Sequence, residues 1–145
     1  MKSRKLLQAF TMIELLAVLA IIGILASIIS RGGVSIRQQA YRKQAAATIS
    51  ALEVSIEMYE SDVGTYPTDD LGLDCDAMYN DLITGGHGPY IELNDDQVSA
   101  GQVIDPWGNA FRYDCLTPVH NTTAYDLWSC GPDGKNGNSD DVKNW

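Results

Sequence analysis

The stretch FTMIELLAVLAIIGILASIIS, residues 10–30, decides the fold of this chain. It is apolar except for one charged residue, Glu14, near its start. As an α-helix it would be about 31 Å long, at about 1.5 Å per residue, which matches a bilayer core of about 30 Å. We therefore predict a transmembrane helix over residues 10–30.

A short basic segment, MKSRKLLQA, precedes this helix and carries Lys2, Arg4 and Lys5. A basic segment followed by an apolar run is typical of an export signal. The sequence after the run shows no clear small-residue cleavage pattern. The junction between Ala9 and Phe10 stands out instead, and a cut there would leave the whole apolar segment on the mature protein.

A basic leader followed by F-T-M-I-E-L-L resembles the type III signal of type IV pilins and pseudopilins. In that family a prepilin peptidase on the cytoplasmic face cuts before the Phe and methylates the new amino terminus. The resemblance implies a leader peptide over residues 1–9, cleavage between Ala9 and Phe10, methylation of Phe10, and a head outside the cytoplasm. The family usually has Gly before the cut. Because this chain has Ala9, we expect slower processing.

Glu14 is costly in hydrocarbon unless it is paired or neutralised. Cleavage would create a positive amine at Phe10, one helical turn away. In a filament, that amine on one subunit would meet Glu14 on another and set the axial register. The alternative is that Glu14 only stabilises the first turn of its own helix. The surrounding motif favours the role in assembly.

Composition limits the remaining possibilities. The chain has 145 residues and a net charge of −9, so it has room for one anchor and one small domain. Removing the three leader cations makes the mature charge −12, that is −9 minus 3. From residue 62 onward the only basic residues are Arg112, Lys135 and Lys143. Nucleic-acid binding needs clustered cations and is not expected, whereas an acidic head suits divalent cations.

Residues 31–62 are predicted to form an amphipathic helix that continues into the head. Gly32 and Gly33 cost about 1 kcal/mol each in a helix relative to Ala, and they predict a bend or melted turn where the helix leaves the membrane. Beyond them, one stripe recurs at three- and four-residue steps and is expected to pack on the sheet of the head. Its members are Tyr41, Ala45, Thr48, Ile49, Leu52, Ile56 and Tyr59.

The head is expected to span residues 63–145, because Gly64 and Pro67 end the helix. Residues 69–104 carry a short apolar patch near Met78 to Ile83 and are predicted to be loop with one helical turn. Residues 111–116 and 124–130 are aromatic-rich and predict an antiparallel pair of strands. The fold class is therefore α+β: a long N-terminal helix packed on a small head with a short sheet. Three aromatic residues are expected to anchor its core on the helix stripe: Trp107, Tyr113 and Trp128.

Further motifs resemble the major pseudopilins of type II secretion, the general secretion pathway protein G family within the type IV pilin-like superfamily. They occur in the order of that family and span most of the chain: G-x-Y-P-T at 64–68, G-P-Y-I at 88–91, D-P-W-G-N at 105–109, Y-D-L-W-S at 125–129 and G-P-D-G at 131–134. The resemblance implies a major structural subunit of a periplasmic pseudopilus that helps folded proteins cross the outer membrane.

The same resemblance implies the location and partners. The chain would be a single-pass protein of the cytoplasmic (inner) membrane with its head in the periplasm. It would contact copies of itself in a helical homopolymer, minor pseudopilins, the inner-membrane secretion platform, prepilin peptidase and membrane lipid. Two alternatives remain open: a type IV pilin for adhesion, motility or DNA uptake, and a membrane-tethered calcium-binding module that never polymerises.

The last stretch, SCGPDGKNGNSDDV at 129–142, is rich in glycine and aspartate. Three carboxylates that come close need a cation, and calcium suits hard oxygen ligands in a flexible loop. The family resemblance implies calcium held by the side chains of Asp133, Asp140 and Asp141 and by the backbone oxygens of Cys130 and Asn138. The alternative is a solvated acidic turn, which composition alone favours.

Three cysteines, Cys75, Cys115 and Cys130, lie in the head. In an oxidising compartment, three cysteines are most simply explained by one disulfide and one free thiol. We predict the disulfide Cys115–Cys130, and the alternative is three unpaired buried thiols. An enzyme is not expected and no catalytic residue is proposed. His87 and His120 both lie in polar, loop-like segments without a nucleophile motif.

Overall fold

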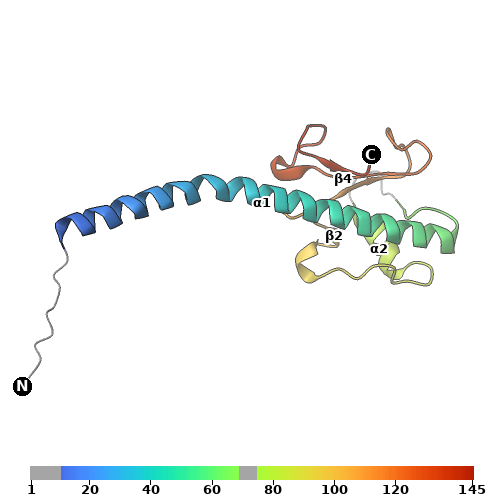
Figure 1. The fold of residues 1–145 in the computed structure, drawn as a ribbon. Coiled ribbons are helices and arrows are strands. Elements are labelled where there is room, and N and C mark those ends of the chain that lie inside the picture. Colours follow the sequence, from blue (N-terminus) through green and yellow to red (C-terminus); the bar gives the residue numbers. More distant parts are fainter. Residues whose placement is uncertain (1–10, 69–74) are drawn as a thin grey trace, which may run out of the picture. The chain divides into compact units, whose positions relative to one another are not determined.

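The computed structural model describes residues 11–68 and 75–145, and the side chains of residues 28–34 lie outside its description (Figure 1). The chain divides into two compact units, Met1–Gln38 and Gln39–Trp145. Helix α1 (Met12–Val63) contributes residues to both units. From here on we call the second unit, Gln39–Trp145, the head. It is longer than the predicted head of residues 63–145 because it includes the part of α1 from Gln39 onward.

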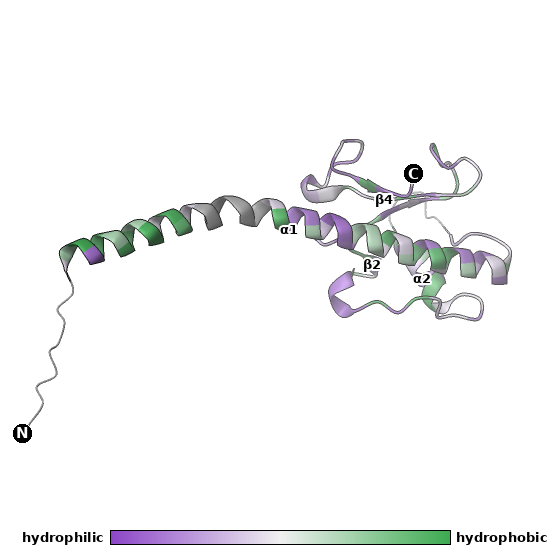
Figure 2. Ribbon diagram, viewed as in Figure 1, coloured by the Kyte–Doolittle hydropathy of each residue, from purple (hydrophilic) through white to green (hydrophobic). Residues whose placement is uncertain are grey.

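The N-terminal part of α1 is apolar and exposed. Its large side chains from Met12 to Leu25 are 48–89% exposed, so the described residues of the chain do not cover them. Figure 2 colours this part of the helix mostly as hydrophobic. Within the described residues, no helix combines the length and hydropathy required of a membrane span.

Helix α1 continues through Gly32 and Gly33 without a break, so the predicted melted turn is wrong, and the alternative of a bend at this point stays a prediction. Each glycine costs about 1 kcal/mol relative to Ala, but every added helical residue also gains one backbone hydrogen bond. A long helix therefore tolerates two glycines. It ends at Val63, where Gly64 adopts a φ of 86° and its N–H donates to Glu60 O at 2.7 Å.

The predicted stripe of α1 is the helical side of the head's core. Six of its seven members are buried: Ala45, Thr48, Ile49, Leu52, Ile56 and Tyr59. Tyr41, at the end of the stripe, is 38% exposed and meets the edge of Trp107 at a centroid distance of 6.0 Å. In Figure 1 the segments that carry β4, β2 and α2 lie beside this part of α1, and residues of all of them share one hydrophobic cluster.

The main sheet has three antiparallel strands in the order β3-β4-β5. They are β3 (Arg112–Asp114), β4 (Asp126–Ser129) and β5 (Val142–Lys143). The predicted pair of strands is confirmed by the register between β3 and β4, in which Tyr113 faces Leu127. Tyr113 and Leu127 are both fully buried and belong to the core.

Residues 75–103 contain more structure than the sequence indicated. Helix α2 (Asp76–Thr84) buries Met78 and Leu82. The short helix η1 (Asp95–Gln97) leads into a hairpin of β1 (Val98–Ser99) and β2 (Gln102–Val103). The hairpin turns through Ala100 and Gly101, whose φ values of 52° and 81° suit the twist of a two-residue loop. The expected helical turn is present as α2, which is longer than one turn, whereas the expectation of loop was wrong for η1, β1 and β2. Polar residues separate the few apolar ones in this region, and only tertiary packing brings them together in the core.

Trp128 does not pack on the helix stripe as predicted. Successive residues of a strand point to opposite faces, and Leu127 occupies the core face of β4. Trp128 therefore lies on the outer face, where Trp145 covers it edge-on at a centroid distance of 5.9 Å. Tyr113 is a core anchor as predicted, and Trp107 packs half-buried at the margin of the core.

The predicted disulfide is wrong: Cys115 and Cys130 are not bonded to each other, and Cys75 is a thiol as well. The reason is the register, which pairs Arg112 with Trp128. Continued along the hairpin, this register places Cys115 and Cys130 near opposite ends, about 16 Å apart at about 3.3 Å per residue. A disulfide tolerates a Cα separation of about 7 Å at most.

Candidate functional site

The segment between β4 and β5, residues 130–141, forms the candidate site and is called the terminal loop. It begins with the short helix η2 (Gly131–Asp133) and turns at Gly134, whose φ is 66°. The loop then returns to β5, which pairs with β4. The sequence therefore places Asp133 at one end of the loop and Asp140 and Asp141 at the other.

Asp141 is the buried carboxylate of this loop, with a side chain that is fully shielded from solvent. Its Oδ2 atom accepts hydrogen bonds from the backbone N–H groups of Gly137 (2.9 Å) and Asn138 (3.2 Å). The Lys143 ammonium lies 3.3 Å from the same oxygen. The other oxygen, Oδ1, is buried without a hydrogen-bond partner in the structure.

Asp133 and Asp140 take part in other hydrogen bonds of the loop than Asp141 does. The two oxygens of Asp133 accept from the Lys135 N–H (2.9 Å) and from Asn138 Nδ2 (3.0 Å). The backbone N–H of Asp140 donates to Asn138 Oδ1 at 3.0 Å. Within the described residues, no three His, Cys, Asp or Glu side chains gather closely enough to hold a metal ion. The expected convergence of three carboxylates is therefore not seen, because donors within the loop hold Asp133 and Asp141 separately.

The donor set of the loop nevertheless suits a hard cation. A buried carboxylate oxygen without a partner is costly, and a cation would satisfy it. The side chains of Asp133 and Asp140 supply further oxygens, and calcium accepts backbone carbonyls as well. Burial raises the pKa of the Cys130 thiol, against the lowering effect of the Arg112 guanidinium. Calcium takes oxygen ligands, so of the groups of Cys130 only the backbone oxygen would suit it.

The D-P-W-G-N turn supports the terminal loop, a role that sequence reasoning missed. Asn109 Nδ2 donates to Gly131 O at 2.8 Å. Asp105 fixes the turn by accepting the Trp107 and Asn109 N–H groups, and it also accepts the Ser129 hydroxyl. The Asx-turn chemistry of this motif was visible in the sequence, but its contact with a loop 22 residues away was not.

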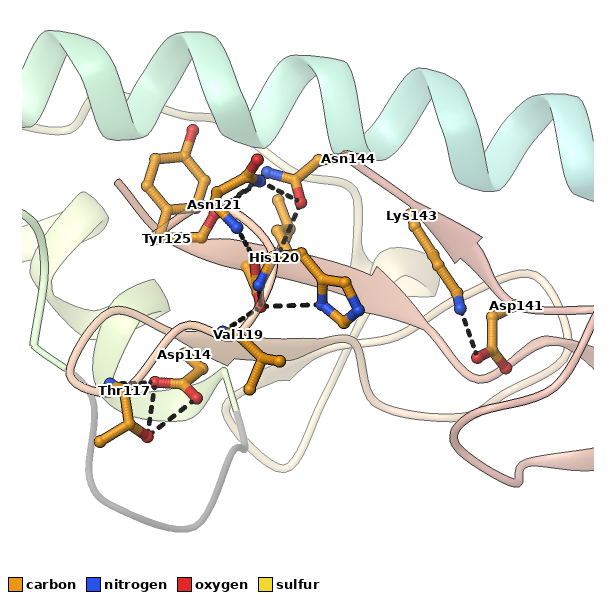
Figure 3. A network of polar contacts seen from close by, with 11 residues as sticks. Asp114, Thr117, Val119, His120, Asn121, Tyr125, Asp141, Lys143 and Asn144 are labelled. Atoms are coloured by element: carbon orange, nitrogen blue, oxygen red, sulfur yellow. Dashed lines mark hydrogen bonds and ion pairs between the residues drawn. The ribbon is translucent and has the colours of Figure 1, made fainter. Parts of the chain in front are cut away.

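The outer face of the sheet carries a second polar network (Figure 3). The buried carboxylate of Asp126 accepts backbone N–H groups from Val119, His120 and Asn121 at 2.8–3.0 Å, and the His120 ring at 3.2 Å. Burial pushes the pKa of Asp126 upward, but these hydrogen bonds outweigh it and leave the pKa below its usual value of 3.8. Asn144 Oδ1 accepts from the Leu127 N–H at 3.0 Å, which ties the chain end to β4.

Glu14 lies in the first turn of α1 and forms a reciprocal cap with Thr11. The Thr11 N–H and hydroxyl donate to Glu14 Oε2 at 3.0 and 2.9 Å, and the Glu14 N–H donates to the Thr11 hydroxyl at 3.4 Å. This arrangement is a capping box. It gives a structural basis to the alternative that Glu14 stabilises the first turn of its own helix. The carboxylate is exposed and remains open to a second contact. Ala9 and Phe10, the predicted processing site, lie outside the described residues.

Comparisons with known proteins cover nearly the whole sequence. Residues 34–145 match the family model "Type II secretion system (T2SS), protein G", and residues 5–30 match "Prokaryotic N-terminal methylation motif".

The chain is 34% identical over 140 residues to the type II secretion system core protein G of Escherichia coli (strain K12), covering 95% of this chain and 90% of that protein. It is 35% identical over 145 residues to the protein of that name from Pseudomonas aeruginosa, covering 98% and 97%. The crystal structure of the major pseudopilin from the type 2 secretion system of enterohaemorrhagic Escherichia coli aligns with a TM-score of 0.52 at 25% identity, covering 78% of this chain and 93% of that chain.

Proposed function

Because the chain belongs to the type II secretion system protein G family and is a structural subunit of the pseudopilus, we propose that it polymerises with copies of itself into a periplasmic filament. The filament would help folded proteins cross the outer membrane. The observation that supports this proposal best is the family match over the head, together with the methylation motif over the start of the chain. The role is structural, and no catalytic residue is assigned.

The apolar part of α1 provides the anchor in this proposal. Its exposed side chains need a cover that the chain does not supply, either lipid or the corresponding helices of other subunits. We propose that residues 10–30 hold the subunit in the inner membrane with the head in the periplasm, and that the same surface packs against other subunits after assembly. Prepilin peptidase, minor pseudopilins and the inner-membrane secretion platform would be its protein partners.

Glu14 would set the register between subunits. The capping box holds its carboxylate on Thr11, the residue that would follow the new amino terminus in the sequence after cleavage. A charge-assisted hydrogen bond between that amine on one subunit and Glu14 on another is stronger than a neutral one. The apolar surfaces would supply attraction, and this polar contact would fix the axial position.

Calcium would complete the terminal loop. Asp133, Asp140 and Asp141 would supply side-chain oxygens, and Cys130 and Asn138 would supply backbone oxygens. The support for this assignment is the buried Oδ1 atom of Asp141, which has no hydrogen-bond partner in the structure. The ion would neutralise the clustered negative charge and contribute its binding free energy to the folded head.

Deleting the gene tests the proposed function against its main alternative. A secretion pseudopilin predicts that enzymes normally secreted accumulate in the periplasm, and that expression of the wild-type chain restores their export. If surface pili vanish while secretion continues, the chain acts as a type IV pilin. A head that stays tethered and never forms oligomers under secretion conditions would instead favour a calcium-binding module.

A further inference from the structure

The terminal loop contains the dipeptide Asn136-Gly137, the single Asn-Gly pair in the sequence. Asn136 is exposed, and among the described residues no hydrogen bond holds its side-chain amide. Asn138, two residues later, differs: its Nδ2 donates to Asp133 at 3.0 Å, and its Oδ1 accepts from the Asp140 N–H at 3.0 Å. The structure thus gives the Asn136 amide no hydrogen bond within the described residues, whereas the Asn138 amide is held through both its nitrogen and its oxygen.

Gly137 provides the steric conditions for a reaction with that free side chain. Its φ is 94°, and apart from its two chain neighbours no heavy atom lies within 4 Å of the place where a Cβ atom would stand. The space beside its Cα atom is therefore open. Because glycine has no side chain, its backbone also reaches conformations closed to other residues. Gly137 therefore places no side chain of its own in the way of the Asn136 amide.

We propose that Asn136 is a site of spontaneous deamidation and that Asp141 restrains the reaction. The Gly137 nitrogen gives up its proton to solvent and attacks the side-chain carbonyl carbon of Asn136. The new carbon–nitrogen bond closes a succinimide ring, and the side-chain nitrogen takes up a proton and leaves as ammonia. Water then opens the ring at either carbonyl, which gives aspartate or isoaspartate. The balance is one water consumed and one ammonia released.

The restraint comes from the hydrogen bond of Gly137 to Asp141. The Gly137 N–H donates to Asp141 Oδ2 at 2.9 Å. This contact orients the nitrogen toward Asp141, and a carboxylate next to it disfavours the loss of its proton. The reacting nitrogen is thus held by a side chain that the fold buries completely. Deamidation is expected to be slow while this contact lasts and faster whenever the loop opens.

The product would alter the loop that carries it. Aspartate at 136 adds one negative charge to a segment that already holds Asp133, Asp140 and Asp141. Isoaspartate adds one carbon to the main chain and displaces the Gly137 N–H from Asp141. Either product weakens the contacts that hold Asp141 in place. This inference requires neither calcium nor assembly.

Mass mapping of the aged full-length protein tests the proposal. The mature chain, purified from membranes in detergent with a chelator present, is incubated in mildly alkaline buffer. Amide loss is followed separately at Asn136 and Asn138, and isoaspartate is resolved from aspartate. We expect Asn136 to react about tenfold faster than Asn138, because only Asn136 precedes glycine. Asn136→Gln is the matched control, and it should abolish the mass gain at that position.

Two variants test the restraint. Asp141→Ala should accelerate amide loss at Asn136 about fivefold, the factor expected for one ordinary hydrogen bond. Asp133→Ala removes another carboxylate of the same loop that does not accept from Gly137, and it should change the rate less. Equal rates of amide loss at Asn136 and Asn138 in the wild-type protein would contradict the proposal that Asn136 is a deamidation site. Equal acceleration by both variants would overturn the specific role of Asp141 and assign the effect to general loosening of the loop.

Discussion

The indole ring of Trp145 stacks on the imidazole ring of His120, with ring centroids 4.0 Å apart and planes inclined by 11°. The Lys143 ammonium lies 5.2 Å from the centroid of the same indole. Together with the edge-on contact to Trp128, these interactions make the last residue of the chain a cover for the outer face of β4. The chain end is thus part of the packing of the head.

Replacing Trp145 with alanine should destabilise the head. The indole is 40% exposed, so the loss should be modest: about 1–2 kcal/mol from the stacked and edge-on contacts together. Urea unfolding of the head measures this loss of stability as a lower midpoint concentration of urea, with an unchanged dependence of the unfolding free energy on urea. Trp145→Phe keeps a stacked ring and should recover most of the loss. A Trp145→Ala head as stable as the wild type would show that the chain end adds nothing.

Calcium should raise the melting temperature of a soluble fragment that lacks residues 1–33 and contains the whole head. An ion that binds only the folded state adds about 2.7 kcal/mol at a free concentration a hundredfold above its Kd. Magnesium should add less, because it demands a tighter octahedral shell of ligands. Differential scanning calorimetry with calcium, magnesium or chelator gives the comparison.

Single-residue variants show whether calcium raises the melting temperature by binding to the terminal loop. Asp133→Ala or Asp140→Ala should abolish the calcium-dependent shift and reduce pseudopilus assembly, whereas Asp96→Ala, an exposed aspartate of η1, should leave the shift intact. If the wild-type head melts at one temperature with calcium and with chelator, the terminal loop is only a solvated acidic turn.

Asp126 should govern part of the acid sensitivity of the head. Its pKa is lower in the folded protein than the usual 3.8, so its contribution to stability is complete above that value and is lost as pH falls through the folded pKa. Asp126→Asn should cost about 2 kcal/mol at neutral pH, because donors that met a carboxylate then meet a neutral group. The variant should also lose less stability in acid than the wild type.

Urea midpoints measured from neutral pH down to the acid transition test this expectation. Asp96→Asn, at an exposed site, is the control and should follow the wild-type curve. Parallel curves for the wild type and Asp126→Asn would mean that Asp126 does not contribute to the acid transition.

Glu14 variants can separate the helix cap from the subunit contact. Glu14→Ala removes both functions, whereas Glu14→Gln keeps an acceptor for the capping box but carries no charge. We expect both variants to insert into the membrane at wild-type levels and both to assemble poorly. Sheared filaments and membrane monomer are quantified separately by immunoblot. Wild-type filament yield from Glu14→Gln would limit Glu14 to capping its own helix.

Processing should occur between Ala9 and Phe10, and the mature protein should begin with methylated Phe10. Mass analysis of the N-terminal peptide from membrane-extracted protein identifies the new end. Ala9→Gly restores the residue usual in the family and should speed conversion of precursor to mature protein in a pulse-chase experiment. An intact Met1, or a cut within residues 27–33, would contradict the assignment.

The sequence predicted the elements whose signals are local. The period of the helix stripe identified the face of α1 that is buried from Ala45 to Tyr59, and the alternating aromatic segments identified the strands around Tyr113 and Leu127. The motifs around Phe10 and Glu14 pointed to the family, because that signal lies in consecutive residues and does not depend on packing. The sequence placed the terminal loop directly after the strand that is β4, but it did not predict the hydrogen bonds that its aspartates accept.

The sequence by itself determined the long helix, its apolar start, the class of the head and the family, since each follows from periodicity or consecutive motifs. Only the tertiary structure decided the contacts that depend on register and chain reversal. The pairing of β3 with β4 separated Cys115 from Cys130, and strand alternation turned Trp128 toward Trp145. The return of the terminal loop buried Asp141 and left one of its oxygens without a partner. Residues far apart in sequence meet only when the whole chain folds, because burial is set by neighbours that no local pattern specifies.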